Sequence, residues 1–430
     1  MNYFYKILLI LSLIVFTEQS QANTLFDSLK SAYLNNPKLN AERASMRATR
    51  EQKRGAVAEF LPNVTISKYV SGQKNTEGRT GGSDSNSRPS EKSFTVEQKI
   101  FQGGYGIANF GKKKNEKSGG EFKLKKVEQD ILLEAAKAHT ELLLSKKKVN
   151  INLINIDLLE RQVETDQNRL EKGEISLTDL AQSESSLAGG QAQLISAQND
   201  LITGKANFEK VIGKKASENI NEKKITNLNL PGSLASAYRI SSSENPDLQI
   251  SLLEYKQAKL DIIIAKSDMT PSATVKYKIA EQQDISSAVK QRTQETVTAT
   301  ATWPLFSGGS NFFNLRRALE IKNQKELLYE DKKKEVETNV ANAWSKYQSS
   351  KSVLNSIKSQ VKAAEIANEG ITLEYESEGS RTTLEVIQSR TILLNSRINL
   401  ASAERDFLIS QFNLLSSTGR LTAKQLKLKK

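Results

Sequence analysis

Apolar residues recur every three or four positions along two very long stretches of this chain, residues 105–170 and 310–376. In the first stretch the repeating apolar positions are Val127, Ile131, Ala135, Ala138, Leu142, Val149, Leu153, Ile156 and Val163. This spacing is typical of helices that pack together along a coiled-coil seam. The pattern therefore predicts two long helices, each about 100 Å in length at a rise of about 1.5 Å per residue.

A shorter helix precedes each long helix, and another follows it. The predicted entering helices are Leu25–Phe60 and Ser233–Asp268, and the predicted returning helices are Leu177–Ile212 and Leu384–Ser417. One entering and one returning helix placed end to end match the length of the long helix beside them. This match favours the wall of a helical barrel, built from long antiparallel coiled-coil helices, over an extended filament.

The apolar period changes to two between each entering helix and the following long helix. Apolar residues alternate with threonines from Val297 to Trp303, and the stretches 64–70, 94–100 and 272–279 repeat this alternation. Four strands of about ten residues, apolar on one face and polar on the other, match the signature of transmembrane β-barrels. Aromatic residues near the strand ends are candidates for the girdle of such a barrel: Tyr69, Phe101, Trp303 and Phe306. We expect the Gly-, Ser- and Asn-rich stretch 73–92 to form an outward-facing loop.

Four strands are too few to close a barrel by themselves. In lipid, an open sheet edge leaves backbone groups unpaired at a cost of several kcal/mol each, and the smallest closed barrels have about eight strands. The sequence therefore predicts that several copies share one barrel. Three copies would give a twelve-stranded barrel, although the strand count by itself does not choose three copies over two or four.

The chain contains an internal duplication. Phe101-Gln102-Gly103-Gly104 returns as the sequence 306–309, and Asp179-Leu180-Ala181-Gln182-Ser183 matches the sequence 385–389. We predict a first repeat at residues 23–213, a linker at 214–228, a second repeat at 229–419 and a basic C-terminal tail at 420–430. The Gly-Gly pairs lack the spacing of phosphate-binding loops and are interpreted as corners between strand and helix.

The first 22 residues have the features of a cleavable signal peptide. Lys6 is followed by the apolar run Ile7–Phe16, and Ser20-Gln21-Ala22 fits a small-x-small cleavage site. The run is too short to span a bilayer as a helix. There is no cysteine, so disulfides, thiolate metal sites and a lipid anchor on cysteine are excluded.

The composition also narrows the classes of function. The 62 Lys and Arg residues outnumber the 49 Asp and Glu residues, giving a formal net charge of +13, but the lysines are scattered along helices without interleaved aromatic residues. This pattern indicates a solvated basic face rather than a nucleic-acid interface. We expect no enzyme activity, cofactor or metal site, because no nucleophile, base or ligand cluster is visible. His139, the only histidine, aligns with Trp344 of the other half and is expected to pack in the wall.

Taken together, the duplicated order of helix, strand pair and hairpin helices, the Gly-Gly corners and the turn motifs resemble the TolC family of outer-membrane efflux and secretion proteins. This resemblance covers essentially the whole mature chain. It implies a homotrimer with a twelve-stranded barrel in the outer membrane of a Gram-negative bacterium and a helical tunnel across the periplasm. It also implies a passive exit duct of a tripartite efflux or type I secretion system. The implied partners are outer-membrane lipid, a periplasmic adaptor (membrane fusion) protein and an inner-membrane transporter of the ABC, RND or MFS type.

The resemblance further implies a gate at the turns between long and returning helices, residues 170–182 and 375–388. The sequence Gly379-Ser380-Arg381-Thr382 places Arg381 at the family's gate arginine. The other implied gate residues are Thr178, Asp179 and Tyr375, and the implied pore constriction is formed by Glu385 and Gln388. An arginine can donate two hydrogen bonds to one carboxylate, and this bidentate contact suits such a gate.

Other interpretations remain open on the sequence. Arg381 is also consistent with an exposed arginine at a helix start, Asp179 and Glu385 with acids that favour a helix N-terminus, and Tyr375 with ordinary packing. For the whole chain, the second hypothesis is a secreted coiled-coil scaffold or adhesin without a pore. That hypothesis accounts for the helices and the charge, but not for four alternating strands that recur with the repeat. The sequence does not identify the cargo.

Overall fold

The computed structural model describes residues 24–75, 85–217, 220, 228–284, 290–377 and 381–428. The predicted signal peptide lies outside these residues. The chain divides into two compact units, each assembled from segments distant in sequence. The first unit comprises Met1–Glu42, Leu124–Pro246 and Lys334–Lys430, and the second comprises Arg43–Lys123 and Asp247–Lys333.

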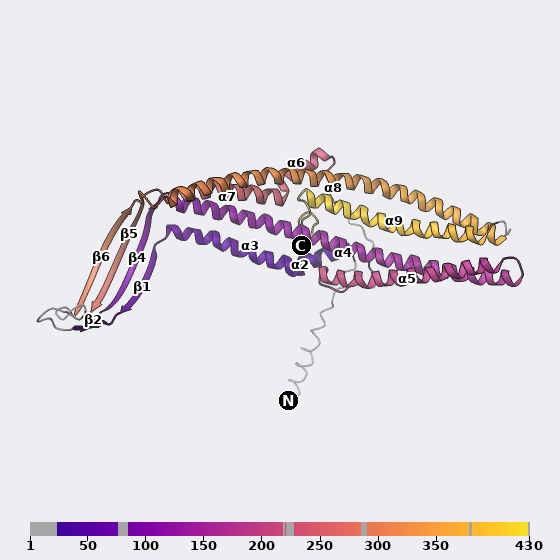
Figure 1. Ribbon diagram of the computed structural model, residues 1–430, viewed down its shortest axis with the longest axis horizontal. Coiled ribbons are helices and arrows are strands. Elements are labelled where there is room, and N and C mark those ends of the chain that lie inside the picture. Colours follow the sequence, from indigo (N-terminus) through magenta and orange to yellow (C-terminus); the bar gives the residue numbers. More distant parts are fainter. Residues whose placement is uncertain are drawn as a thin grey trace, which may run out of the picture. The chain divides into compact units, whose positions relative to one another are not determined.

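The long and returning helices are found where the sequence predicts them. The long helices are α4 (Tyr105–Glu171) and α8 (Ser310–Ser377), and the returning helices are α5 (Leu177–Ile212) and α9 (Thr383–Ser417). Figure 1 shows α4 and α5 as one antiparallel hairpin and α8 and α9 as a second, with both turns at the same end. Among the described residues, no helix is both long and apolar enough to cross a membrane.

The prediction of single entering helices was wrong, because each is broken in two. The first consists of α2 (Leu25–Asn35) and α3 (Pro37–Gly55), followed by the 3-10 turn η1 (Ala56–Phe60). The second consists of α6 (Leu234–Glu244) and α7 (Pro246–Ser267). Each break falls on an asparagine before a proline, where the proline ring disfavours helical backbone for the preceding residue.

The two asparagines at these breaks have the same role in each repeat. Asn36 is extended, with ψ of 123°, and its side-chain amide donates to the carbonyl of Val211 at 3.2 Å. Asn245 has ψ of 121°, and its amide donates to the carbonyl of Ser417 at 2.8 Å. Both acceptors lie in the last turn of a returning helix, where carbonyl groups lack helical partners. The internal duplication is therefore preserved at the level of single hydrogen bonds.

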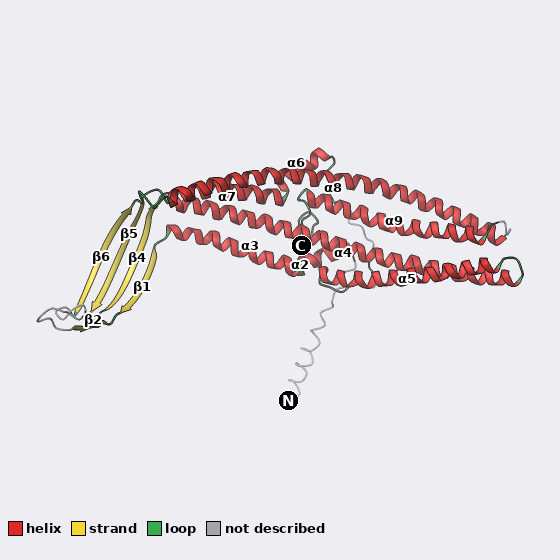
Figure 2. Ribbon diagram, in the orientation of Figure 1, coloured by secondary structure: helices red, strands yellow, loops and turns green. Residues whose placement is uncertain are grey.

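A four-stranded antiparallel sheet lies in the second unit (Figure 2). Its strands are β1 (Asn63–Val70), β4 (Ser90–Gln102), β5 (Ser272–Gln283) and β6 (Gln291–Thr302), in the order β1-β4-β5-β6. The predicted fold, mainly helical with four strands per chain and an internal duplication, is confirmed. In the described part of the chain, the outer edges of β1 and β6 have no strand partner.

The predicted tip loop 73–92 was too long. A short ladder of β2 (Gln73–Asn75) and β3 (Ser85–Ser87) lies within it, and β4 already begins at Ser90. These strands consist almost entirely of polar residues, so the alternation on which strand prediction depends is missing from them. Residues 76–84 lie outside the described part of the chain.

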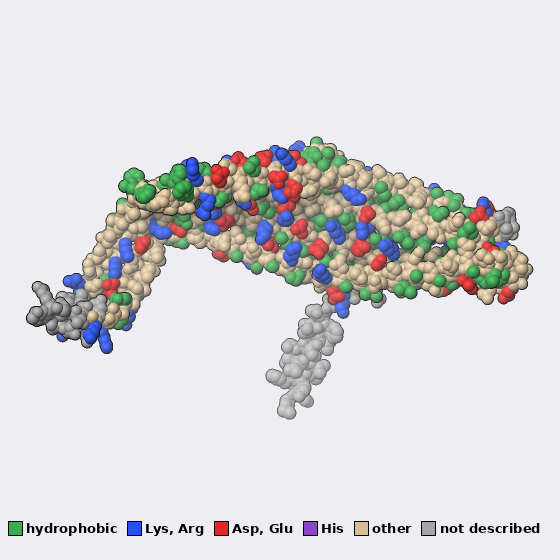
Figure 3. Space-filling view, viewed as in Figure 1, with side chains coloured by type: hydrophobic (Ala, Val, Ile, Leu, Met, Phe, Trp, Pro, Cys, Tyr) green, Lys and Arg blue, Asp and Glu red, His purple; other side chains and the backbone are tan. Residues whose placement is uncertain are grey.

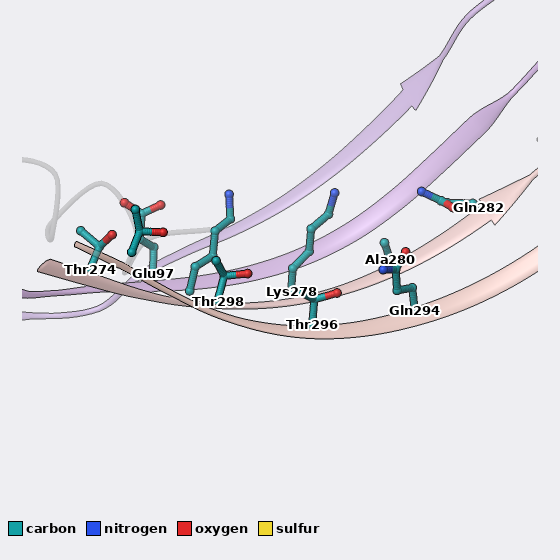
Figure 4. A pocket seen from close by; sticks show the side chains of 10 residues that line it. Glu97, Thr274, Lys278, Ala280, Gln282, Gln294, Thr296 and Thr298 are labelled. Atoms are coloured by element: carbon teal, nitrogen blue, oxygen red, sulfur yellow. The ribbon is translucent and has the colours of Figure 1, made fainter. Parts of the chain in front are cut away.

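The two faces of the sheet differ in polarity as the alternation predicts. Val64, Val96, Tyr277 and Val297 lie opposite one another across the four strands, and Thr65, Thr95, Lys278 and Thr296 form the adjacent row on the other face. The polar face surrounds a hollow of about 400 Å³, which Figure 4 shows lined by threonine, lysine and glutamine side chains. The sheet is therefore concave on its polar side, with the apolar side chains on the convex side.

The C-terminal segment is part of the core of the first unit rather than only a basic tail. Leu421, Leu426 and Leu428 are buried in the same apolar cluster as Phe208 and Phe412. His139 is also buried, as expected for a wall position. The Ser28 hydroxyl lies 2.8 Å from His139 Nδ1, and burial lowers the pKa of His139 to about 4.

Charged side chains of both signs are interspersed over the helices. On the face shown in Figure 3, Lys and Arg side chains alternate with Asp and Glu rather than gathering over the helices in one patch. Cross-helix ion pairs such as Lys147 with Glu404, at 2.9 Å, account for part of this mixing. This distribution agrees with the interpretation of the net charge as a solvated face.

Candidate functional site at the turns of the helical hairpins

Both returning helices begin with the same reciprocal cap. The Ser176 hydroxyl and backbone N–H donate to Asp179 Oδ2 at 2.7 and 3.0 Å, while the Asp179 N–H donates back to Ser176. Thr382 and Glu385 make the equivalent cap at the start of α9. These hydrogen bonds lower the pKa of both carboxyl groups, with the Arg381 guanidinium contributing at Glu385. Asp179 and Glu385 therefore cap the N-termini of their own helices, α5 and α9.

Arg381 is held within its own hairpin. Its Nε donates to Glu374 at 2.6 Å, at the end of α8, and its Nη1 donates to Glu385 at 3.1 Å. Among the described residues, no hydrogen bond or ion pair joins Arg381 to Thr178 or Asp179. Thr178 is exposed in the first turn of α5. Within one chain, the structure does not bring these three predicted gate residues together.

Tyr375 is a contact between the two hairpins, and its partner is not among the predicted gate residues. Its side chain is 3% exposed, and its hydroxyl donates to Asp166 Oδ1 at 2.5 Å and lies 3.1 Å from Thr383 Oγ1. Burial raises the pKa of Tyr375, and the hydrogen bond to Asp166 adds to the increase. The tyrosine therefore contacts Asp166 of α4 rather than Asp179.

Asp166 is the acceptor at the centre of this contact. It is fully buried, and it accepts hydrogen bonds from Gln162 at 2.9 Å and from Ser183 as well as from Tyr375. We refer to Gln162, Asp166, Ser183, Tyr375 and Thr383 as the Asp166 cluster. Sequence reasoning missed Asp166, although a signal was present: it follows Val163 by three residues, so a carboxylate continues the apolar seam of the long helix.

Two arginines lie beside the Asp166 cluster. The Arg169 guanidinium lies 4.5 Å from the centre of the Tyr375 ring and also donates to Glu174 at 3.1 Å. Arg390 of α9 donates to the carbonyl of Leu158 in α4 at 3.0 Å, and burial lowers its pKa. These contacts join the α8–α9 hairpin to the α4–α5 hairpin near their turns. A cation over an aromatic ring adds about 0.5–2 kcal/mol.

The remaining predicted residues lie on exposed surfaces. Glu385 and Gln388 are one turn apart near the start of α9, and Gln388 is exposed. Trp303 and Phe306 follow β6 with exposed side chains, and Phe101 lies opposite Ala273 on the apolar face of the sheet. Tyr69 lies opposite Glu91, whose carboxylate bonds Lys278 on the polar face. The register therefore separates Tyr69 from the other girdle candidates, because Lys68 occupies the apolar-face position.

Comparison with known proteins gives consistent results. A family model described as "Outer membrane efflux protein" matches residues 28–214 and 237–420. The outer membrane efflux protein BepC of Brucella suis is 25% identical, covering 95% of this chain and 88% of BepC. Outer membrane protein TolC of Escherichia coli is 23% identical, covering 98% and 87%. Among solved structures, the Campylobacter jejuni CmeC outer membrane channel superimposes with a TM-score of 0.82 at 13% identity, covering 94% of this chain and 90% of CmeC.

Proposed function

Because this chain belongs to the outer membrane efflux protein family and is an outer-membrane duct for efflux or secretion, we propose that it works as a homotrimer with a gate at the turns of its helical hairpins. The duct is passive, and substrate moves through the interior without chemistry. The proposed partners are a periplasmic adaptor and an inner-membrane transporter. We also propose that residues 1–22 direct export and are then removed.

The observation that carries this proposal is that the four-stranded sheet has two open edges and one polar face. Among the residues that the structure describes, its edge strands β1 and β6 each leave one row of backbone groups unpaired, and its polar face is concave. Unpaired backbone groups in lipid cost several kcal/mol each, so the edges must pair with other copies. Three copies would supply twelve strands, with the threonine-rich face towards the interior and the apolar face towards lipid.

The gate proposal rests on Arg381 and its two acidic partners. Arg381 lies between Glu374 and Glu385, which come from the two helices of one hairpin. Without the guanidinium, these two carboxylates would repel each other at the turn. Threefold symmetry would also bring three Glu385 side chains together, which attracts cations, while the neutral Gln388 keeps this constriction less negative than one with two acidic rings.

The experiment is single-channel conductance of the purified protein in planar bilayers. Wild type should form channels of small conductance, and Arg381→Ser should raise the conductance several-fold. The matched control is Arg397→Ser. Arg397 lies on α9 and pairs with Glu365 of α8 at 2.9 Å, and its exposure is close to that of Arg381. Equal conductance in all three proteins would show that Arg381 does not keep the gate closed.

The scaffold or adhesin hypothesis predicts a different outcome in the same preparation. A protein without a pore would show no conductance steps, and it would not fractionate with the outer membrane as an oligomer that dissociates on heating. Conductance by the wild type therefore decides between the two functions before any variant is compared.

A further inference from the structure

The two helical hairpins are copies of one another, so each position in one has an equivalent in the other. Helix α4 ends at Glu171 and α8 at Ser377, and α5 begins at Leu177 and α9 at Thr383, so both bounds differ by 206 residues. The same offset relates Ser183 to Ser389. It makes Thr372 the equivalent of Asp166, and Tyr375 the equivalent of Arg169.

The equivalent positions have very different surroundings. Asp166 accepts hydrogen bonds from three side chains, whereas the Thr372 hydroxyl is buried and has no hydrogen-bond partner among the described residues. Ser183 donates to Asp166, while its equivalent Ser389 donates to Asn368 at 3.2 Å. At this pair of equivalent positions, the acidic acceptor is therefore supplied by the first repeat.

Asp166 joins elements that belong to different hairpins. Besides Gln162 of its own helix, its donors are Ser183 on α5 and Tyr375 on α8, and Tyr375 in turn contacts Thr383 on α9. Asp179, by contrast, makes its hydrogen bonds to Ser176 in its own turn. Of these two aspartates, only Asp166 makes a side-chain contact with the other hairpin.

We propose that Asp166 is the positioning residue that holds the two hairpins of one protomer together in the closed channel. This inference rests on the proposed gate. The closed state of each protomer would depend on the Asp166 carboxylate. Asp179 has the separate role of helix cap, and the Tyr375 hydroxyl donates to the buried Asp166 carboxylate.

The physical reason is the cost of leaving a buried carboxylate without its donors. Asp166 is fully buried, and its oxygens are stabilised by three hydrogen bonds. A small displacement of α8 removes the Tyr375 donor before water can replace it, and an unsatisfied buried charge is strongly unfavourable. Intermediate positions are therefore disfavoured, so each protomer has a dry closed state and a hydrated open state.

The test compares Asp166→Asn with Thr372→Val. Asparagine keeps the shape of the side chain, but its amide group presents a donor towards other donors. Asp166→Asn should raise single-channel conductance several-fold, whereas Thr372→Val removes a hydroxyl without a partner at the equivalent position and should leave conductance unchanged. Tyr375→Phe should raise conductance as Asp166→Asn does, and the double variant should show no greater increase than either single variant.

A second measurement reports on the hairpins directly. The chain has no cysteine, so Lys172→Cys with Ser377→Cys introduces two labelling sites, one on each hairpin. Spin labels on one protomer, diluted with unlabelled protein, should move apart in Asp166→Asn and keep their wild-type separation in Thr372→Val. The temperature at which the trimer dissociates should stay near that of wild type, which separates a positional effect from general destabilisation.

Unchanged conductance and unchanged label separation in Asp166→Asn would overturn the proposal, as would additive effects of the Asp166 and Tyr375 substitutions. If Asp166→Asn does not fold, Ser183→Ala and Tyr375→Phe test the same cluster. If Arg381→Ser opens the channel and Asp166→Asn does not, the proposed gate is supported and only the proposed role of Asp166 is wrong. If wild type forms no channel, the proposed function fails, and the label separation in detergent still tests whether Asp166 joins the hairpins.

Discussion

The substitutions Val297→Pro and Thr298→Pro should each abolish the trimer and its insertion into the outer membrane. Both residues lie in β6, which pairs with β5 along one edge only. In an antiparallel strand, successive N–H groups point alternately to the two sides, so one of these residues donates to β5 and the other points to the outer edge. Because the proposed trimer pairs that edge with β1 of another copy, removing either N–H breaks a ladder.

The measurement is the amount of heat-dissociable trimer in the outer-membrane fraction, which should fall at least tenfold for both proline variants. Val297→Ala and Thr298→Ala keep the N–H groups and should leave the trimer in place. A free edge would tolerate proline at one of the two positions, because proline is accepted where the missing N–H faces solvent. That asymmetric result would show that β6 has no partner.

Stability of the helical unit should fall as the pH drops from about 6.5 to about 4. Burial lowers the pKa of His139 from 6.5 to about 4, and the charge of Asp27 only partly opposes this effect. Between these values the unfolded chain binds a proton that the folded chain does not, so acid favours unfolding. Across this whole pH range, the free energy of unfolding should fall by about 3 kcal/mol.

His139→Gln should remove most of this pH dependence. Glutamine keeps a polar group near the Ser28 hydroxyl but does not titrate, so the comparison concerns the slope of melting temperature against pH rather than its absolute value. The capping carboxyl groups have lowered pKa values, so their stabilisation is lost at lower pH than that of the histidine. An identical slope in wild type and His139→Gln between pH 6.5 and 4 would show that the imidazole is not kept neutral by burial.

The helices and strands were predictable where one residue pattern extends over many turns. The seam from Val127 to Val163 and the alternation from Val297 to Trp303 each repeat often enough to fix the element type. The breaks at Asn36 and Asn245 were missed because the apolar period continues through them. A proline one residue later was the visible signal, and its effect on the preceding residue is local.

The candidate site was less predictable, because its contacts depend on how two hairpins face each other. Sequence reasoning selected Tyr375 and both acids at the turns, but it did not select Asp166. The register of four helices, which is not encoded in any single segment, brings Tyr375 to Asp166. For Tyr69 the register of β1 is decisive: it runs without a shift and gives the apolar-face position to Lys68, so Tyr69 lies on the polar face.

The C-terminal segment shows the limit of composition as a guide. Its lysines indicated a basic tail, but Leu421, Leu426 and Leu428 are buried against the helices of the first unit. Apolar burial contributes about 25 cal/mol per Å², so a few leucines outweigh the preference of the lysines for water. The lysines remain compatible with this position because their long side chains can extend to solvent.

The most direct test of the account is the mass of the purified, detergent-solubilised protein by light scattering, corrected for bound detergent. A sheet of four strands with two open edges has to be completed by other copies, and the proposed twelve-stranded barrel needs three. The account therefore predicts three chains per particle. A single chain that stays monodisperse in water without detergent would contradict it.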